Sequence, residues 1–245
     1  MLNTITTIRL PDGTQVAFTD WSDKPVFSSV ELCHGFTQEE IDIYGYTLGD
    51  PVPAAPPAGL AAIQRSSTDR DTNLAAPAAM ASTEERLIYA IKPEVFYLRT
   101  DAPENNQVDM ESATAVDGTG MPLPGPVFLA QLNRSLLLTL EISRKIFARA
   151  GFGYFNAGFG VFGWGNPAEA TRSYAVNGLP SQEAVRSYVV PHYMGGTEKF
   201  RCYLTNPSGL PVNFGNAELA AKDADTDAVA RIHVYLEGLY KRPVS

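Results

Sequence analysis

Residues 158–163 have the glycine spacing of a nucleotide-binding loop. They read GFGVFG, which matches the GxGxxG pattern of dinucleotide-binding proteins. That chemistry requires the loop to open a helix, whose N-terminus then holds the pyrophosphate. Here WGNP follows, and bulky Phe and Val fill the positions between the glycines. We therefore expect a packed glycine loop and no bound nucleotide.

Asp223, Asp225 and Asp227 have the spacing of the first half of a calcium-binding EF-hand loop. The sixth position of that loop needs glycine and the twelfth needs a bidentate glutamate. Ala228 and Val234 stand at these positions. The pattern therefore indicates a solvated acidic segment, and we expect no metal site.

The remaining chemistry-bearing residues do not form a catalytic motif. The three histidines are His34, His192 and His233, and the chain has no GxSxG or HExxH sequence. Cys33 and Cys202 lie outside any CxxC or Cys/His cluster, which favours two free, buried thiols in a reducing compartment. We expect no catalytic residue and no cofactor, and therefore no enzyme. A hydrolase built on a spatial cluster of carboxylates or histidines stays open as an alternative.

The charge balance argues against general nucleic-acid binding. The chain of 245 residues has 19 basic and 27 acidic side chains, a net charge of −8. Phosphate neutralisation needs concentrated Lys and Arg. Four basic residues leave a nucleic-acid contact open, but we do not favour it, because Glu141 interrupts the group: Arg134, Arg144, Lys145 and Arg149.

The charge is also uneven along the chain. Residues 1–50 have two basic and eight acidic side chains, whereas residues 128–174 have five basic and two acidic ones. The acidic first part could meet the basic middle of a neighbouring copy. Ordinary variation of the surface is the alternative.

Residues 151–165 (GFGYFNAGFGVFGWG) combine glycines with aromatic rings. Glycines let backbones cross closely, and rings fill the space between them. Core packing at a sheet edge, a subunit contact and a sugar-stacking platform are the three interpretations. The residues that we name as possible subunit contacts, together with the basic group nearby, are Tyr154, Phe155, Phe159, Phe162, Trp164, Arg144, Lys145 and Arg149.

The N-terminal part of the sequence predicts a hairpin, a helix and an arm. Thr6–Leu10 and Thr14–Phe18 are β-forming stretches around the turn signal Pro-Asp-Gly. A capping box at 37–40 predicts a short helix that ends at Gly45 or Gly49. Residues 50–62, with four prolines, predict an extended arm or linker.

From residue 85 onward the pattern is mainly that of strands. Leu136–Ile142 alternates with a period of two, which favours a strand over a helix across 128–150. The other expected strands are Arg86–Ile91 and Glu94–Arg99 (split by Lys92-Pro93), Val185–Val190, Lys199–Thr205 and Arg231–Leu239. Glu218–Val229 is expected to be a short helix.

These elements predict a mainly β protein, an antiparallel β-sandwich or jelly roll with an N-terminal hairpin-helix unit and an extended Pro/Ala-rich arm. We place the hairpin and helix at 1–49, the arm at 50–81 and the β domain at 82–245. The N-terminal sequence lacks the pattern of a signal peptide, and no apolar run approaches a membrane span.

Four stretches resemble the jelly-roll coat proteins of tailless bacteriophages in layout, over about residues 65–245. They are STDRDTNLAAPAAMASTEERLIYAI, LLLTLEISRKIFARAGFGYFNAGFGVFG, VRSYVVPHYMGGTEKFRCYL and IHVYLEGLYKRPV. The resemblance implies a non-enzymatic subunit of a virion that forms a symmetric homo-oligomer and contacts other virion proteins. The alternative function is a carbohydrate-binding β-sandwich, such as a phage receptor-binding module.

Overall fold

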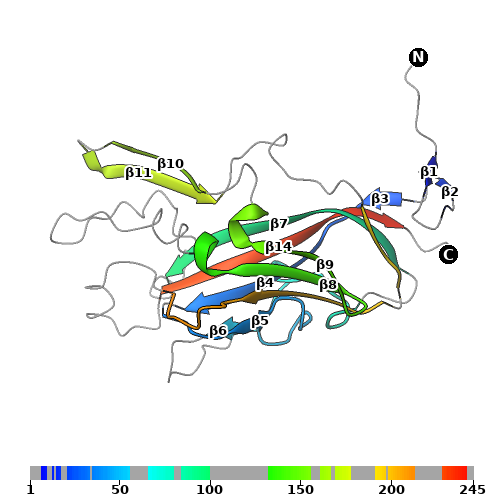
Figure 1. Ribbon diagram of the computed structural model, residues 1–245, viewed down its shortest axis with the longest axis horizontal. Helices are drawn as coiled ribbons and strands as arrows, with labels where there is room; N and C mark the ends of the chain where they lie inside the picture. The colour runs from blue at the N-terminus through cyan, green and yellow to red at the C-terminus, as the bar shows by residue number, and fades with distance from the viewer. Residues whose placement is uncertain are drawn as a thin grey trace, which may run out of the picture.

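The computed structural model describes residues 7–9, 13, 15–17, 21–33, 35–55, 66–79, 84–99, 132–155, 161–166, 169–177, 191–196, 198–212 and 228–241. The protein is mainly β and contains two large sheets (Figure 1). Two short two-stranded ribbons accompany them.

The first large sheet has six strands. Its order is β12-β7-β14-β4-β6, and β3 pairs with the end of β14. The strands are β3 (Trp21–Asp23), β4 (Val26–Cys33), β6 (Ala54–Ala55), β7 (Glu85–Arg99), β12 (His192–Met194) and β14 (Ala228–Lys241). The long strands β7 and β14 pair along their whole length, and β4 lies on the other side of β14. All pairs are antiparallel except β4 with β6.

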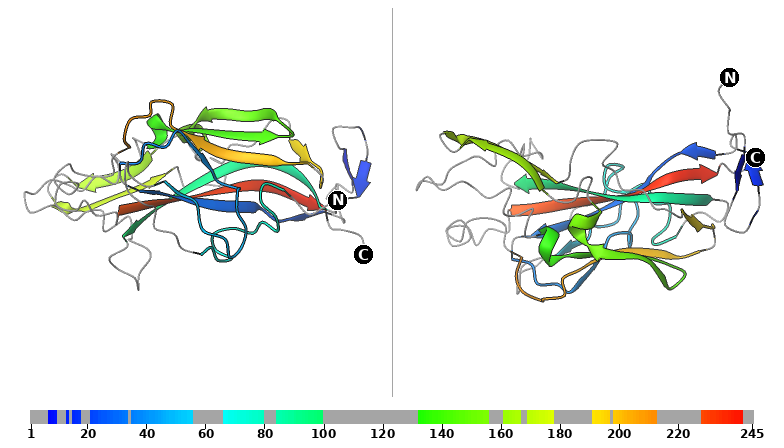
Figure 2. Two further views of the ribbon diagram at one scale, coloured as in Figure 1. Left: turned by 90° about the horizontal axis from the view of Figure 1, so that it is seen from below. Right: turned by 45° about the horizontal axis from the view of Figure 1, so that its top comes forward.

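The second large sheet has four antiparallel strands in the order β5-β13-β8-β9. They are β5 (Glu40–Asp42), β8 (Leu137–Ile142), β9 (Lys145–Gly151) and β13 (Phe200–Thr205). The side views in Figure 2 show this sheet stacked on the six-stranded one. The chain passes repeatedly between the two layers: β4, β7, β12 and β14 belong to the first sheet, whereas β5, β8, β9 and β13 belong to the second.

The larger apolar core of the described residues lies between the two sheets. Val30, Ile232 and Val234 of the first sheet and Leu138 and Leu204 of the second are at most 1% exposed. Residues from all three expected segments, 1–49, 50–81 and 82–245, take part in this core. The segments therefore fold together.

The period-two patterns are confirmed for the apolar face of each strand, although Thr139 of β8 and His233 of β14, on the other faces, are buried as well. Leu138, Leu140 and Ile142 of β8 are buried, and β13 buries Phe200, Cys202 and Leu204 while Arg201 and Tyr203 are half-exposed; β14 buries Ile232, Val234 and Leu236. The N-terminal hairpin is also confirmed as β1 (Thr7–Arg9) and β2 (Gln15–Ala17). The alternative helix across 128–150 is wrong for residues 137–150, which form β8, β9 and their turn; within that range the described residues 132–135 form one short helical turn.

The helix expected after Thr37 is wrong. Its residues form the strand β5 and a series of bends. Ile41 and Ile43 are two positions apart and both are buried, which is the spacing of a strand face. The pairing of β5 with β13 supplies backbone hydrogen bonds that outweigh the local capping signal.

The break expected at Lys92-Pro93 is also wrong, because β7 runs through both residues. A proline is tolerated in a strand where its missing N–H faces an unpaired side. Among the described strands, β12 pairs with β7 only at Arg86–Ile88, so that side of β7 is open at Pro93.

The described parts of the expected arm pack on their own chain. Ala54–Ala55 pairs with β4, and the Asn73 side chain accepts from the Phe27 N–H at 3.0 Å and donates to the Pro25 carbonyl at 2.8 Å. These contacts cover the free side of β4. The expected elements Val185–Val190 and residues 218–227 lie outside the described residues.

Candidate interaction surface

The hairpin of β8 and β9 holds the three basic residues that were expected to make contacts. Arg144, Lys145 and Arg149 are exposed. The turn is formed by Ser143 and Arg144 with φ of 49° and 66°, the left-handed region that side chains rarely adopt. Ser143 is held in place because its N–H donates to the Lys199 carbonyl at 2.9 Å. The turn therefore presents Arg144 from a fixed position.

Among the described strands, β9 lies at an edge of the four-stranded sheet, and part of it is exposed and apolar. Ile146 is 55% exposed and Phe147 is 39% exposed. The register between β8 and β9 shifts at this point, so that Phe147 has no partner residue on β8 and forms a β-bulge. Its ring contacts His192 edge-on at 4.9 Å, which joins this edge to β12 of the other sheet. Burial lowers the pKa of His192.

The aromatic residues after β9 divide between core and surface. A 3₁₀ turn, η3 (Phe152–Tyr154), buries Phe152 completely. Phe155 is 5% exposed and belongs to the core, so its side chain is not available for a contact. Tyr154 is 37% exposed and packs edge-on against Phe155 at 5.4 Å, and it remains a candidate.

The other expected aromatic contacts stay predictions. Phe162 and Trp164 lie on β10 (Val161–Asn166), which pairs with β11 (Glu169–Asn177), and Phe159 lies outside the described residues. Residues 161–163 of the GxGxxG match are therefore strand, where a dinucleotide loop would begin a helix.

The opposite edge of the four-stranded sheet is acidic, and the sequence analysis missed it. Arg201 donates to Glu40 at 2.8 Å and to Asp42 at 3.0 Å, and its guanidinium lies over the Tyr203 ring at 5.0 Å. These bonds raise the pKa of Arg201. Glu39 is exposed beside them. The sequence feature that could have revealed this acidic edge is the cluster of acidic residues at 39–42, which the capping-box interpretation assigned to the start of a helix.

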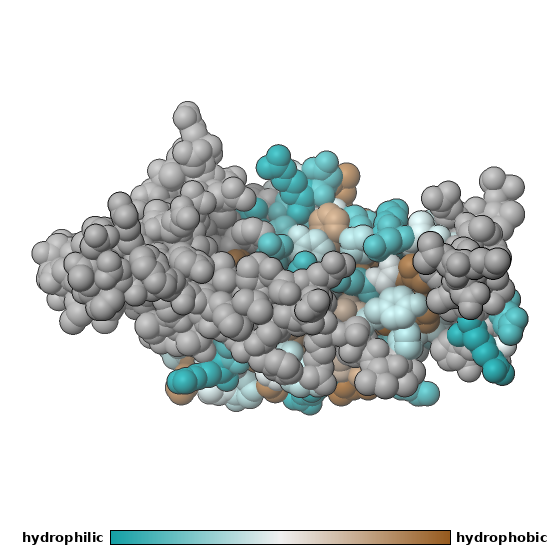
Figure 3. All heavy atoms as spheres, turned by 90° about the horizontal axis from the view of Figure 1, so that it is seen from above, coloured by the Kyte–Doolittle hydropathy of each residue, from teal (hydrophilic) through white to brown (hydrophobic). Residues whose placement is uncertain are grey.

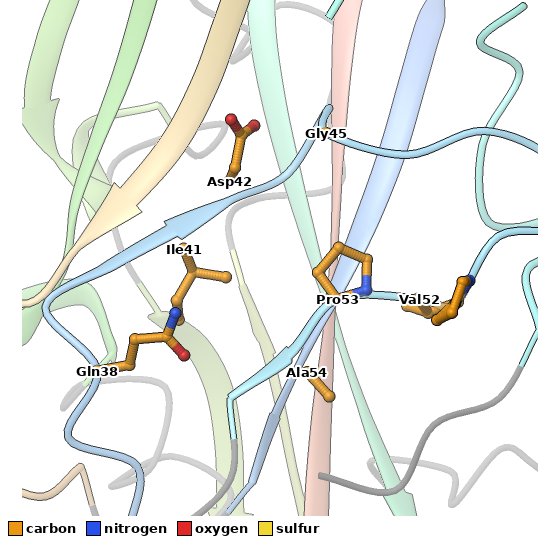
Figure 4. Close-up of a pocket in the computed structure, with 8 residues that line it drawn as sticks. Gln38, Ile41, Asp42, Gly45, Val52, Pro53 and Ala54 are labelled. Atoms are coloured by element: carbon orange, nitrogen blue, oxygen red, sulfur yellow. The ribbon is translucent and has the colours of Figure 1, made fainter. Parts of the chain in front are cut away.

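A pocket of about 370 Å³ adjoins β5. Figure 4 shows β5 on one side and the segment around β6 on the other. The lining residues are Gln38, Ile41, Asp42, Gly45, Pro51, Val52, Pro53 and Ala54. Among them Asp42 is the one ionisable side chain and Gln38 the one amide.

A buried ion pair joins the two neighbouring strands β4 and β14. Arg231 donates to one Glu31 oxygen from Nε at 3.1 Å and from Nη2 at 2.8 Å, and its Nη1 lies 3.9 Å from Asp71. Asp71 in turn accepts from the Thr68 N–H and hydroxyl at 2.8 and 2.9 Å. The network attaches residues 66–79 to the sheet, which is a structural role.

The two cysteines are free and buried, as expected. Burial raises the pKa of Cys33 to about 11 and also raises the pKa of Cys202. Within the described part of the chain, no three His, Cys, Asp or Glu side chains gather closely enough to hold a metal ion. His34 and the acidic residues 223–227 lie outside that part.

No family model, curated protein or solved structure matches this chain. None of the described helical segments has the length and apolar character needed to cross a membrane. On the described surface in Figure 3, polar and apolar side chains are interspersed.

Proposed function

We propose that the protein is a structural subunit of a bacteriophage particle, located in the virion, with a jelly-roll domain that assembles with further copies of itself and with other virion proteins. The observation that carries the proposal is the nesting of the strand pairs. β4 pairs with β14, β5 with β13, β7 with β12, and β8 with β9.

This nesting supports the assignment of the domain as a jelly roll. Each pair lies inside the preceding one along the chain, as in a long hairpin whose tip is the β8–β9 turn. Wrapping such a hairpin puts alternate pairs in different layers. The β4–β14 and β7–β12 pairs lie in the six-stranded sheet, and the other two pairs lie in the four-stranded one. Eight strands in two such sheets are typical of viral capsid and lectin domains.

Fold alone does not decide between a capsid-type subunit, a lectin and an enzyme. The surface of this protein favours the capsid-type subunit. The described pocket has one carboxylate, Asp42, and lies beside a sheet edge. Exposed apolar residues lie on the β9 edge of the four-stranded sheet, namely Ile146 and Phe147, and Leu48, in the turn that follows β5, is 61% exposed. Edges of this kind are templates for association with another chain.

The test is to purify the untagged protein and combine light scattering with electron microscopy over a range of concentration. We expect a discrete oligomer or closed particle. A monomer of 26.5 kDa at every concentration that binds a defined sugar on a glycan array would overturn the proposal in favour of the carbohydrate-binding alternative.

A further inference from the structure

The two edges of the four-stranded sheet have opposite charge. The basic edge consists of Arg144, Lys145 and Arg149 on β9 and its turn, all exposed. The described residues provide no ion-pair partner for these three side chains. The acidic edge consists of Glu39, Glu40 and Asp42, against the single cation Arg201. It therefore has a net charge of −2.

The backbone of β5 is suited to accept another strand. The Ile43 N–H donates to the Cys202 carbonyl at 2.9 Å, and the Glu39 carbonyl accepts from the Asn206 N–H at 2.8 Å. Odd-numbered residues therefore face β13, so the backbone groups of Glu40 and Asp42 face away from it. The Gln38 side chain donates to the Glu40 carbonyl at 2.9 Å, in the place where a neighbouring strand would donate.

The pocket of about 370 Å³ lies along this outward side of β5. Pro51 and Pro53 form part of its far wall, and prolines have no N–H to offer to β5. Among the described residues, the Gln38 side chain alone bonds to the outward backbone groups of Glu40 and Asp42, so these groups can pair with a strand from another molecule. Leu48 lies close by in the sequence and is exposed, as Ile146 is on the basic edge.

The strand directions also allow β5 of one copy to pair with β9 of another copy. Because the sheet has four antiparallel strands, β5 and β9 run in opposite directions. A second copy in the same orientation therefore places its β5 antiparallel to β9 of the first copy. Pairing of β9 with β9 would instead bring Lys145 and Arg149 of both copies together, and like charges across such a pair are destabilising.

We propose that copies of this chain associate head to tail, with the basic edge of one copy paired to the acidic edge and pocket of the next, so that the four-stranded sheet continues across the interface. The inference builds on the proposed function and names its contact. Such a heterologous contact repeats from copy to copy, and it closes into a ring when the rotation allows.

The experiment uses four single charge reversals in the full chain. Arg149→Glu changes the basic edge and Glu39→Lys changes the acidic edge. Arg70→Glu and Asp69→Lys are matched controls, because both residues are exposed and lie in the 66–79 segment, in neither edge. Thermal unfolding establishes that each variant is folded, and sedimentation velocity over a concentration series measures association.

We expect each edge variant to weaken association at least about tenfold relative to its matched control. The Arg149→Glu, Glu39→Lys double variant should recover part of this loss, because the reversed charges again attract. Raising the salt from about 50 to 500 mM should weaken the wild type, since exposed charges are screened.

The outcomes separate this inference from the proposed function. Closed wild-type particles that all four reversals leave unchanged would overturn the edge contact and leave the proposed function standing. A loss with Arg149→Glu but none with Glu39→Lys would overturn β5 as the partner. Association that depends on both edges but yields only open chains would keep the contact and count against a particle. A wild type that stays monomeric throughout overturns the contact.

Discussion

The Tyr44 hydroxyl donates a hydrogen bond of 2.6 Å to the carbonyl oxygen of Val234, in the opposite sheet. Tyr44 follows β5 and is completely buried, and its ring also packs edge-on against Phe200 at 5.3 Å. The hydroxyl lies 3.2 Å from the Val26 carbonyl as well. One side chain from the four-stranded layer thus joins two strands of the six-stranded layer, and burial raises the pKa of this phenol.

Tyr44→Phe should therefore destabilise the protein by about 1–3 kcal/mol, because it removes a buried hydrogen bond that joins the two sheets. Tyr203→Phe is the matched control, since Tyr203 is half-exposed and we expect a change within about 0.5 kcal/mol. Urea unfolding followed by fluorescence measures both. Equal stability of the two variants would show that the bond contributes nothing.

Gly238 lies at the irregularity between β14 and β7, where Tyr89 is the extra residue. A Cβ at this position would lie 2.0 Å from the Leu87 carbonyl oxygen, and a backbone atom cannot rotate away as a side chain does. Gly238→Ala should therefore cost about 3 kcal/mol, a fall of roughly 6–12 °C in Tm. Gly195→Ala, whose nearest contact is a Tyr193 ring atom at 3.8 Å, should change Tm by less than about 2 °C. A similar small change at both positions would contradict the clash.

The sequence predicted those parts of the fold in which burial follows a local pattern. The strands β8, β13 and β14 each bury one alternating set of apolar residues, and this period is visible in the sequence. The basic group of Arg144, Lys145 and Arg149 is also visible in the sequence, because clustered basic residues stand out in an acidic chain.

The errors came from interactions between residues far apart in sequence. The capping signal at Thr37 is local, whereas the partner that makes β5 a strand is Leu204, more than 160 positions away. The acidic edge was missed for the same reason, because Arg201 assembles it only once β13 lies beside β5. The composition of the glycine-aromatic stretch does not predict which of its rings is buried. Tyr154 is exposed, whereas its neighbour Phe155 lies in the core.

The buried ion pair of Arg231 and Glu31 should behave unlike an exposed one. Their side chains are 16% and 9% exposed. Arg231→Met should cost about 3–5 kcal/mol, because it leaves Glu31 buried without its cation. Adding Glu31→Met should restore part of that loss, because the Glu31 charge is gone while the buried Asp71 carboxylate, with its hydrogen bonds from Thr68, remains.

The control for this prediction is the pair of Lys92 and Glu237, which is 45% and 40% exposed and 3.8 Å apart. Lys92→Met should cost less than about 1 kcal/mol, since solvent screens such pairs. A double-mutant cycle by urea unfolding measures both couplings. A coupling at Arg231 no larger than at Lys92 would contradict the role assigned to the buried network.

His192 should make the protein less stable in mild acid. Burial lowers its pKa below the ordinary value of 6.5, so the unfolded chain binds a proton more readily than the folded one. Its contribution is fully present above pH 6.5 and declines as the pH falls toward the folded pKa. His192→Phe keeps a ring against Phe147 and removes the titration.

The comparison that isolates this effect is the unfolding free energy of the wild type minus that of His192→Phe, measured from pH 7.5 to pH 5. The difference should fall with decreasing pH, because the titration of the carboxylates is common to both proteins and cancels. A constant difference would show that His192 has the same pKa in both states.

Arg144→Gly should change stability and association in opposite directions. Arg144 has φ of 66°, which costs an L-residue roughly 1–2 kcal/mol and costs glycine almost nothing. Glycine loses more entropy on folding, so the net gain should be about 0.5–1 kcal/mol. The same change removes a charge from the basic edge, and association should weaken about threefold to tenfold.

Arg144→Lys keeps both the charge and the backbone strain and should leave both stability and association near wild type. Urea unfolding and sedimentation velocity on the same preparations measure the two effects. If the glycine variant is more stable and associates as well as the wild type, Arg144 contributes to the turn alone and must be removed from the contact.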